Sequence, residues 1–347
     1  MGFAACRMSP GYYYPLVGGA SVSFPAMMKE IAVQRTVGQH CLDVNAARKA
    51  QIALVVSEET IKAMPNLSGF TAPSRIIDQF YNADGSVWMR PRIKNIINYE
   101  TFVGNQDRFT RSGAPVDQLL AEDLADAPGD YKLYVFLNCY KFDEKFLNAL
   151  RQLRRRKCVL LWLYAPGFWK GLSSGTDNMK QLTGLDFEML FNTAPAVKLK
   201  DGRLMGTPDV KISPVFAVKT PGAEILGTYD NGKIGVAAVK TGKALTVFSG
   251  PWQLDKNFIA EILKRAGVFR YITSDDPSDA NTRLFVLHAR YSGRKHVRLP
   301  RRTTVLDVFA KKIIARNADC FETVLNLHET KWFYLGEDAD TLLKKIP

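Results

Sequence analysis

The chain has 347 residues, 46% of them hydrophobic and 11% aromatic, and its 47 Lys+Arg against 34 Asp+Glu give a formal net charge of +13. This composition excludes a disordered tail, a collagen-like fibre and a disulfide-stapled miniprotein. The length is typical of two domains, each with enough chain to bury a core. The longest apolar runs, such as Cys158–Tyr164, are far shorter than the roughly 20 residues of a membrane span, so we expect a soluble protein with no membrane partner.

The cysteines and glycines carry no metal or cofactor motif. The five cysteines include no C-x-x-C pair, which favours reduced thiols in the cytoplasm. His, Cys, Asp and Glu do not recur at metal-ligand spacing, so we predict no metal site. A G-x-G-x-x-G or Walker loop is also missing from the sequence, which argues against a nucleotide cofactor.

The first half of the chain reads as alternating strands and helices. Gln51–Thr60 (QIALVVSEET) is typical of a buried parallel strand that ends in a polar loop. The strand Tyr131–Tyr140, the helix Asp143–Arg156 and the apolar run from Lys157 form a βαβ unit, whose strands we expect to be parallel. Between these strands, Arg75–Tyr81 and 92–102 are predicted to be helical.

The second half contains shorter strands and a change of class near its end. Residues 187–249 offer several short β segments, followed by the amphipathic helix Lys256–Ala266, which Gly267 stops. These elements predict a doubly wound α/β sheet. Ser274–Asn281 (SDDPSDAN) is predicted to be a polar linker. Strands without crossover helices follow it, as in a small antiparallel β domain.

Several of these segments carry a family resemblance. They are QIALVVSEET, RSGAPVDQLLAEDL, GDYKLYVFLNCYKFDEKFLNALRQL, VLLWLYAPGFW, LTGLDF and VFSGPW. This series resembles the region after the catalytic barrel in beta-galactosidase-like glycoside hydrolases related to family 42. The resemblance implies a flavodoxin-like, class I glutamine-amidotransferase-like "trimerisation" domain over residues 49–275 and a small antiparallel β domain over 276–347. It also implies a homo-oligomer that acts on a glycan or small glycoside.

The resemblance does not extend to the catalytic barrel, so the two glutamates that serve the family's catalysis have no counterpart in this sequence. A (β/α)8 barrel needs roughly 250 residues, whereas residues 1–48 offer only a segment, Phe24–Leu42, that resembles the final helix of such a barrel and its linker. Amidotransfer would need a nucleophile at a strand-to-helix elbow. Tyr164–Gly167 has none, and Cys139 is favoured as a buried structural thiol because all four His lie outside the predicted α/β domain.

Carboxylates and aromatics gather in the loops that follow the predicted parallel strands, where open α/β sheets bind ligands. We predict a catalytic pair of either Glu58 or Glu59 with Asp255, roughly 5–5.5 Å apart for a retaining glycosidase or roughly 6.5–9.5 Å for an inverting one. The predicted sugar-binding rings are Tyr140, Tyr164, Trp169 and Trp252. The structural alternative is that these acids cap helices and these rings are packing anchors.

Two classes of function therefore remain open. One is a carbohydrate-active glycoside hydrolase that uses these carboxylates. The other is a non-catalytic oligomerisation or sugar-binding module derived from a barrel glycosidase. Nucleic acid is an unlikely partner, because the basic runs Arg151–Lys157 and Arg290–Arg302 accompany no nucleic-acid-binding motif and are typical of solvated faces.

Overall fold

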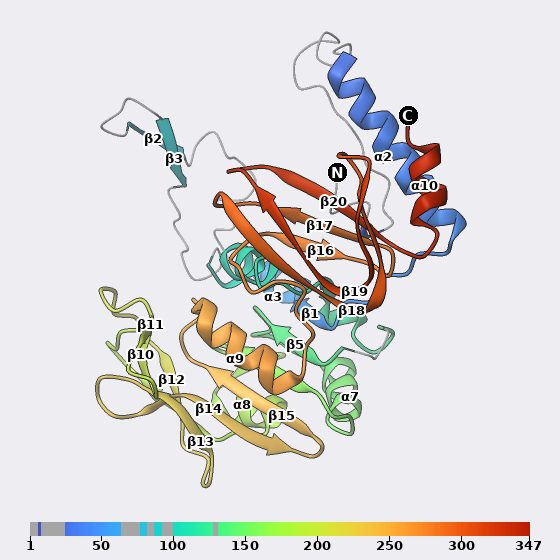
Figure 1. Cartoon of the computed structure of the whole chain (residues 1–347). Coiled ribbons are helices and arrows are strands. Elements are labelled where there is room, and N and C mark those ends of the chain that lie inside the picture. Colours follow the sequence, from blue (N-terminus) through green and yellow to red (C-terminus); the bar gives the residue numbers. More distant parts are fainter. Residues whose placement is uncertain (1–5, 8–24, 64–76, 82–86, 92–99, 128–130) are drawn as a thin grey trace. The chain divides into compact units, whose positions relative to one another are not determined.

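A computed structural model describes residues 6–7, 25–63, 77–81, 87–91, 100–127 and 131–347 (Figure 1). The chain divides into two compact units. Unit one comprises Met1–Ile52, Phe109–Asp117 and Gly267–Pro347, and unit two comprises Ala53–Arg108 and Gln118–Ala266. Over the described part of the chain, no helix has both the length and the apolar character that crossing a membrane requires.

The centre of the larger sheet is built from the four predicted apolar strands. They lie side by side in the order β15 (Ala244–Ser249), β6 (Val159–Leu163), β5 (Leu133–Phe136) and β1 (Ile52–Val56). Strand β6 pairs in parallel with both β5 and β15. Every residue of β1, β5 and β6 is buried, which explains why these strands read as continuous apolar runs. This part of the prediction is confirmed.

The same sheet continues beyond β15 with antiparallel strands. Its edge strand on the other side is β4 (Val116–Leu120), next to β1. Beyond β15 come β14 (Ile234–Thr241), β13 (Glu224–Thr228), β10 (Ala196–Leu199) and β11 (Leu204–Gly206), while β12 (Val215–Val218) joins β14 to β9 (Phe187–Leu190). The fold is therefore mixed α/β with a parallel centre, and its flavodoxin-like character stays a prediction.

Short helices lie between the strands along the chain. They are α3 (Glu58–Ala63), α6 (Asn105–Thr110), α7 (Glu144–Leu153), α8 (Thr176–Thr183) and α9 (Lys256–Ala266), with single turns at η3 (Glu100–Gly104) and η4 (Ala121–Asp123). The α7 helix begins where the Asp143 carboxylate accepts a hydrogen bond of 2.8 Å from the Phe146 amide. The α8 helix ends at Gly184, whose φ of 81° favours glycine. A small hairpin joins β7 (Trp169–Lys170) to β8 (Ser173–Ser174).

One predicted helix is wrong. Ile77–Tyr81 forms strand β2, which pairs antiparallel with β3 (Val87–Pro91), so the helical prediction for Arg75–Tyr81 fails where the structure describes it. Ile, Phe and Tyr favour strands, and pairing with a second β-rich segment overrides the helical spacing. Of the second predicted helix, 92–99 lies outside the described residues, and Glu100–Gly104 is a π-helical turn.

Unit one contains a separate five-stranded antiparallel sheet. Its order is β16 (Ser278–Ala280), β17 (Leu284–His288), β20 (Thr330–Leu335), β18 (Gly293–Asp307) and β19 (Lys312–Leu325). The 15-residue strand β18 forms a long ribbon with β19 (Figure 1). Register shifts between Arg298 and Leu306 mark irregular pairing within this ribbon. The predicted antiparallel strands are confirmed as a sheet separate from the larger one.

The predicted polar linker is instead buried structure. Ser278–Ala280 is strand β16, and the side chains of Asp276 and Asp279 are only 1% and 2% exposed. Each carboxylate has a basic partner: Lys295 lies 2.7 Å from Asp276, and Arg48 lies 2.5 Å from Asp279. The prediction failed because polar residues signal a solvated loop only when distant partners do not neutralise them.

The N-terminal helix packs on this same sheet. Helix α2 (Pro25–Asp43) lies beside the C-terminal helix α10 (Ala339–Lys345) (Figure 1). Val33, Val37 and Cys41 of α2 share a buried core with residues of β17, β18, β20 and α10. The core also includes Trp332 and Leu342. The division of the chain into residues 1–48, 49–275 and 276–347 remains a prediction.

Candidate functional site

The polar loop after β1 is organised by hydrogen bonds. The Ser57 amide donates to Asn138 Oδ1 at 2.8 Å, which joins the loops that follow β1 and β5. Ser57 Oγ accepts the Thr60 amide at 3.1 Å, so Ser57 caps α3. Glu122, which follows β4, accepts the Ser57 hydroxyl and the Glu59 amide, each at 3.1 Å. Acidic and amide oxygens thus hold the start of α3.

Glu58 and Glu59, two of the predicted catalytic acids, are exposed and paired with lysines. Their side chains are 53% and 49% exposed. Lys62 lies 3.2 Å from Glu58 and 3.4 Å from Glu59, and Lys141 lies 3.3 Å from Glu59. Hydrogen bonds from Lys141 and Lys62 lower the pKa of Glu59. Glu59 is therefore ionised at neutral pH, which suits a base or nucleophile and not a general acid.

Asp255, the third predicted acid, holds the start of α9. Its Oδ1 accepts the Asn257 amide at 3.0 Å and the Phe258 amide at 3.1 Å. Arg203 also forms an ion pair with this carboxylate. These contacts match the structural alternative, in which Asp255 is an N-cap.

The sheet order separates the two predicted catalytic loops. Glu58 and Glu59 follow β1, Asp255 follows β15, and β5 and β6 lie between these strands. Three spacings of about 4.8 Å place the strand ends roughly 14 Å apart, beyond the roughly 6.5–9.5 Å of an inverting pair. The two loops therefore follow strands that are not neighbours in the sheet, and the pairing of these acids stays a prediction.

Three of the four predicted sugar-binding rings pack against one another. Tyr164 makes edge-on contacts with Tyr140 and Trp252, with ring centroids 5.7 and 5.4 Å apart. Tyr140 and Trp252 are buried, and the Tyr164 hydroxyl donates to the carbonyl of Pro214 at 2.9 Å. Trp169 is 41% exposed and contacts Phe168. Of the four rings, only Trp169 presents a substantial face to solvent.

A cavity opens beside the loop after β1, and it combines the predicted Glu59 with two acids that the sequence did not single out, Glu122 and Asp143. Its volume is about 260 Å³, and its lining includes Glu59, Glu122, Lys141 and Asp143. Glu122 Oε2 is buried without a hydrogen-bond partner among the described residues. The position of Glu122 directly after a strand was a usable signal, but β4 could not be distinguished from a helix in the sequence. This cavity is the candidate functional site.

Cys139, the alternative nucleophile, is buried at the end of the same region. Burial and the charge of Glu122 raise the pKa of its thiol well above the ordinary value, so it is a poor nucleophile. Among the described residues, no group of three or more His, Cys, Asp or Glu side chains could hold a metal ion. The site therefore offers carboxylates and lysines as its reactive groups.

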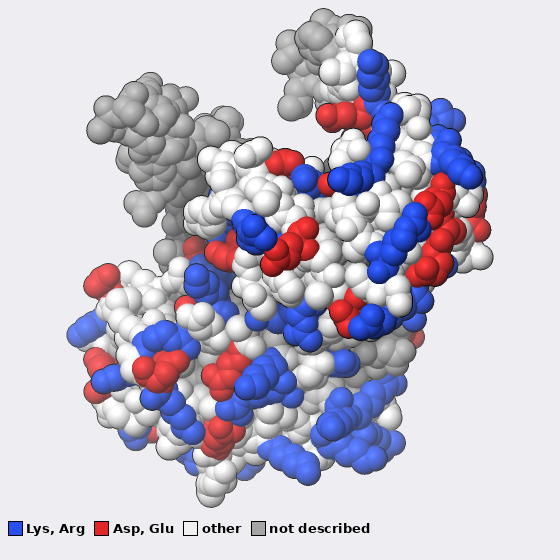
Figure 2. Space-filling model, in the orientation of Figure 1, with Lys and Arg blue, Asp and Glu red and all other residues white. Residues whose placement is uncertain are grey.

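The basic runs are interspersed with acids and local acceptors. Arg151 donates to Asn148 at 2.7 Å, and Arg154 donates to the carbonyl of Leu182. Arg294 pairs with Glu322 at 2.6 Å in the second run. Figure 2 shows basic and acidic side chains side by side over the visible face, with one group of adjoining basic side chains over the end of α7.

Comparisons with known proteins show that solved structures have a fold similar to that of this chain. No family model matches the chain, and no curated protein matches it. The GH42 beta-galactosidase Gan42B from G. stearothermophilus, in a catalytic mutant form, is similar with a TM-score of 0.61 and 15% identity, over 90% of this chain and 44% of that one. The beta-galactosidase from Rahnella sp. R3 is similar with a TM-score of 0.59 and 16% identity, over 88% of this chain and 44% of that one. The beta-galactosidase from Bacillus circulans sp. alkalophilus is similar with a TM-score of 0.58 and 12% identity, over 88% of this chain and 44% of that one.

These likenesses concern the fold alone, since the identities are 12–16%. The chain spans less than half the length of these beta-galactosidases. The structure thus defines a mixed α/β protein with a separate antiparallel sheet. Its fold is similar to part of a GH42 beta-galactosidase, as the sequence motifs indicated.

Proposed function

We propose that this chain is a non-catalytic module of a beta-galactosidase-like glycosidase and that its α/β unit mediates association with further copies. The observation that carries this proposal is the state of the three predicted acids. Glu58 and Glu59 face lysines, and Asp255 faces Arg203 and the start of α9. A glycosidase needs two carboxylates on opposite sides of one bond, whereas these three acids are held by basic side chains and a helix start, which supports a structural role.

The proposal is tested on the purified chain with a panel of nitrophenyl glycosides and by sedimentation velocity. We expect no release of nitrophenol above the blank and the mass of an oligomer. Turnover of any glycoside would contradict the non-catalytic role, and a monomer at micromolar concentration would contradict the association.

The second candidate is a glycoside hydrolase in which Glu58, Glu59 and Asp255 act on a glycan that rests on Trp169, the exposed member of the four predicted rings. The cavity of about 260 Å³ beside Glu59 favours it, because ligand sites in α/β folds lie at this edge of the sheet. If the chain turns over a glycoside, the double variant Glu58→Gln with Glu59→Gln should abolish turnover. The matched control is Glu144→Gln, which removes an exposed acid paired with Lys170. Equal turnover in the double variant and the control would eliminate Glu58 and Glu59.

A further inference from the structure

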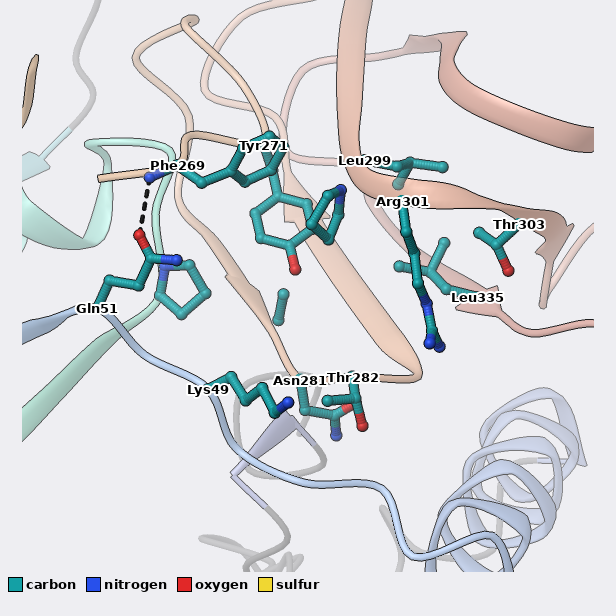
Figure 3. Close-up of a pocket in the computed structure, with 13 residues that line it drawn as sticks. Lys49, Gln51, Phe269, Tyr271, Asn281, Thr282, Leu299, Arg301, Thr303 and Leu335 are labelled. Atoms are coloured by element: carbon teal, nitrogen blue, oxygen red, sulfur yellow. Dashed lines mark hydrogen bonds between the residues drawn. The ribbon is translucent and has the colours of Figure 1, made fainter. Parts of the chain in front are cut away.

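A second cavity lies within unit one. Its volume is about 230 Å³, and 13 residues line it (Figure 3). Most come from the segment after α2, from the middle of β18 and from the chain around β16, and Pro115 and Leu335 complete the lining. With about 30 Å³ for each water molecule, the cavity holds roughly eight waters, which is enough for a single sugar ring and not for a chain of them.

The charge of the lining has one sign. Lys49 and Arg301 are the charged residues among the 13, and the set includes no Asp or Glu. Within the described residues, neither cation lies within ion-pair distance of a carboxylate, whereas the adjacent Arg302 pairs with Asp319 at 3.4 Å. Two basic side chains without acidic partners at one cavity attract an anion.

An aromatic wall is held in place beside these cations. The Tyr271 amide donates to the carbonyl of Gly113 at 2.7 Å, and the carbonyl of Tyr271 accepts the Arg298 amide at 2.7 Å. The Tyr271 ring stacks on Phe285 at 5.1 Å and meets the edge of Phe269 at 5.2 Å. Both the backbone and the ring of Tyr271 are therefore fixed before any ligand arrives.

Polar groups complete the lining. Figure 3 shows the Tyr271 hydroxyl directed into the space between Lys49 and Arg301. Burial raises the pKa of Tyr271 to about 12, so this hydroxyl stays a hydrogen-bond donor at neutral pH. Gln51 Oε1 accepts the Phe269 amide at 2.9 Å, which orients the Gln51 side chain, and Thr282 Oγ1 accepts the Ala47 amide at 2.9 Å.

We propose that this cavity binds a monosaccharide-sized anion, with the sugar ring against Phe269 and Tyr271 and its phosphate or carboxylate against Lys49 and Arg301. Ring faces pack against the C–H groups of a sugar, while the amide and hydroxyls of Gln51, Thr282 and Tyr271 bind its hydroxyls. The site lies within unit one, so it is independent of the function proposed for the acids in unit two.

The test is isothermal titration of the full chain with four probes: glucose 6-phosphate, glucuronate, glucose and inorganic phosphate. We expect one of the two anionic sugars to bind at least about tenfold more tightly than glucose and inorganic phosphate, because each of these probes lacks one half of the contacts. Which anionic sugar binds more tightly distinguishes phosphate from carboxylate recognition.

Variants locate the binding at the cavity. Arg301→Gln should weaken the anionic sugar about tenfold, and Tyr271→Phe, which keeps the stacked ring, should weaken it several-fold. Arg302→Gln is the matched control, since Arg302 neighbours Arg301 but does not line the cavity, and it should leave the affinity unchanged. The proposal is overturned if neither anionic sugar binds, if glucose or phosphate binds as tightly, or if Arg301→Gln has no larger effect than Arg302→Gln.

Discussion

Asp276 and Lys295 form an ion pair in the interior of unit one, with side chains 1% and 7% exposed and 2.7 Å between nitrogen and oxygen. Burial alone would raise the pKa of Asp276, but hydrogen bonds from Lys295, Ser274 and the Arg290 amide hold it below the ordinary value. A carboxyl with a lowered pKa stabilises the fold above its unfolded pKa of about 3.9 and loses that contribution as the pH falls through the folded pKa.

We therefore expect Lys295→Met to lower the free energy of unfolding at pH 7 by about 3–5 kcal/mol, because it leaves a buried carboxylate without its cation. The difference from the parent chain should shrink as the pH falls, because protonation of Asp276 removes the unpaired buried charge from the variant. Urea unfolding at several pH values measures both effects. The control Arg294→Met, which breaks an exposed pair on the same strand, should cost at most about 1 kcal/mol. Equal losses in the two variants would show that burial of this pair does not matter.

Single residues also show what the sequence could reveal about the site. The sequence marks Ser57 and Asp255 as helix starts, and the structure shows both capping helices. The sequence could not show the contacts of Glu122 with Ser57 and Glu59, because they join residues more than 60 positions apart. A helix cap can be predicted from neighbouring residues in the sequence. The distant residue that contacts it, here Glu122, depends on the order of the strands in the sheet.

Among the elements, the helix α2 was predicted correctly, but the core against which it packs was not. The sequence predicts a helix over Phe24–Leu42 as the end of a barrel, and the structure has α2 over Pro25–Asp43. Its buried residues lie in one core with Trp332 and Leu342. The helical spacing is local, whereas the surface that covers it lies almost 300 positions away in the chain.

The core contact of α2 can be tested with Val37→Ala. Val37 is fully buried, so loss of its two methyl groups should lower the free energy of unfolding by about 2 kcal/mol. Urea unfolding followed by tryptophan fluorescence is a suitable measurement, because Trp332 belongs to the same core. Met28→Ala changes an exposed residue of α2 and should stay within about 0.5 kcal/mol of the parent. If Val37→Ala were as mild as Met28→Ala, α2 would not depend on this core.

The sequence identifies some strands and misses others. Continuous apolar runs identify β1, β5, β6 and β15, because strands buried on both faces need no polar alternation. Strands β2 and β16 could not be identified in this way, because the sequence of β2 is typical of a helix and that of β16 is typical of a polar linker. In β16 it is the ion pair between Arg48 and Asp279 that makes burial possible.

For the whole molecule, a net charge of +13 raises the question whether a nucleic acid binds. The structure shows where that charge lies. Many basic side chains have acidic partners, such as Arg265 with Glu224 and Arg316 with Asp340, each at 2.7 Å. The adjoining basic side chains over α7 in Figure 2 remain the place where a phosphate backbone could bind.

We expect binding to a duplex 20-mer to be detectable by fluorescence anisotropy at about 20 mM salt and absent at about 150 mM. Two phosphate contacts would lose roughly 40-fold in affinity over this range, because log K falls by about 0.9 per contact for each unit of log salt. The double variant Arg155→Gln with Lys157→Gln should remove most of the binding at low salt, whereas Arg294→Gln with Arg302→Gln removes two charges that already have acidic partners and should change it less. Binding that survives about 150 mM salt and depends on the base sequence would instead require ordered contacts to base edges, and nucleic acid would become a leading partner.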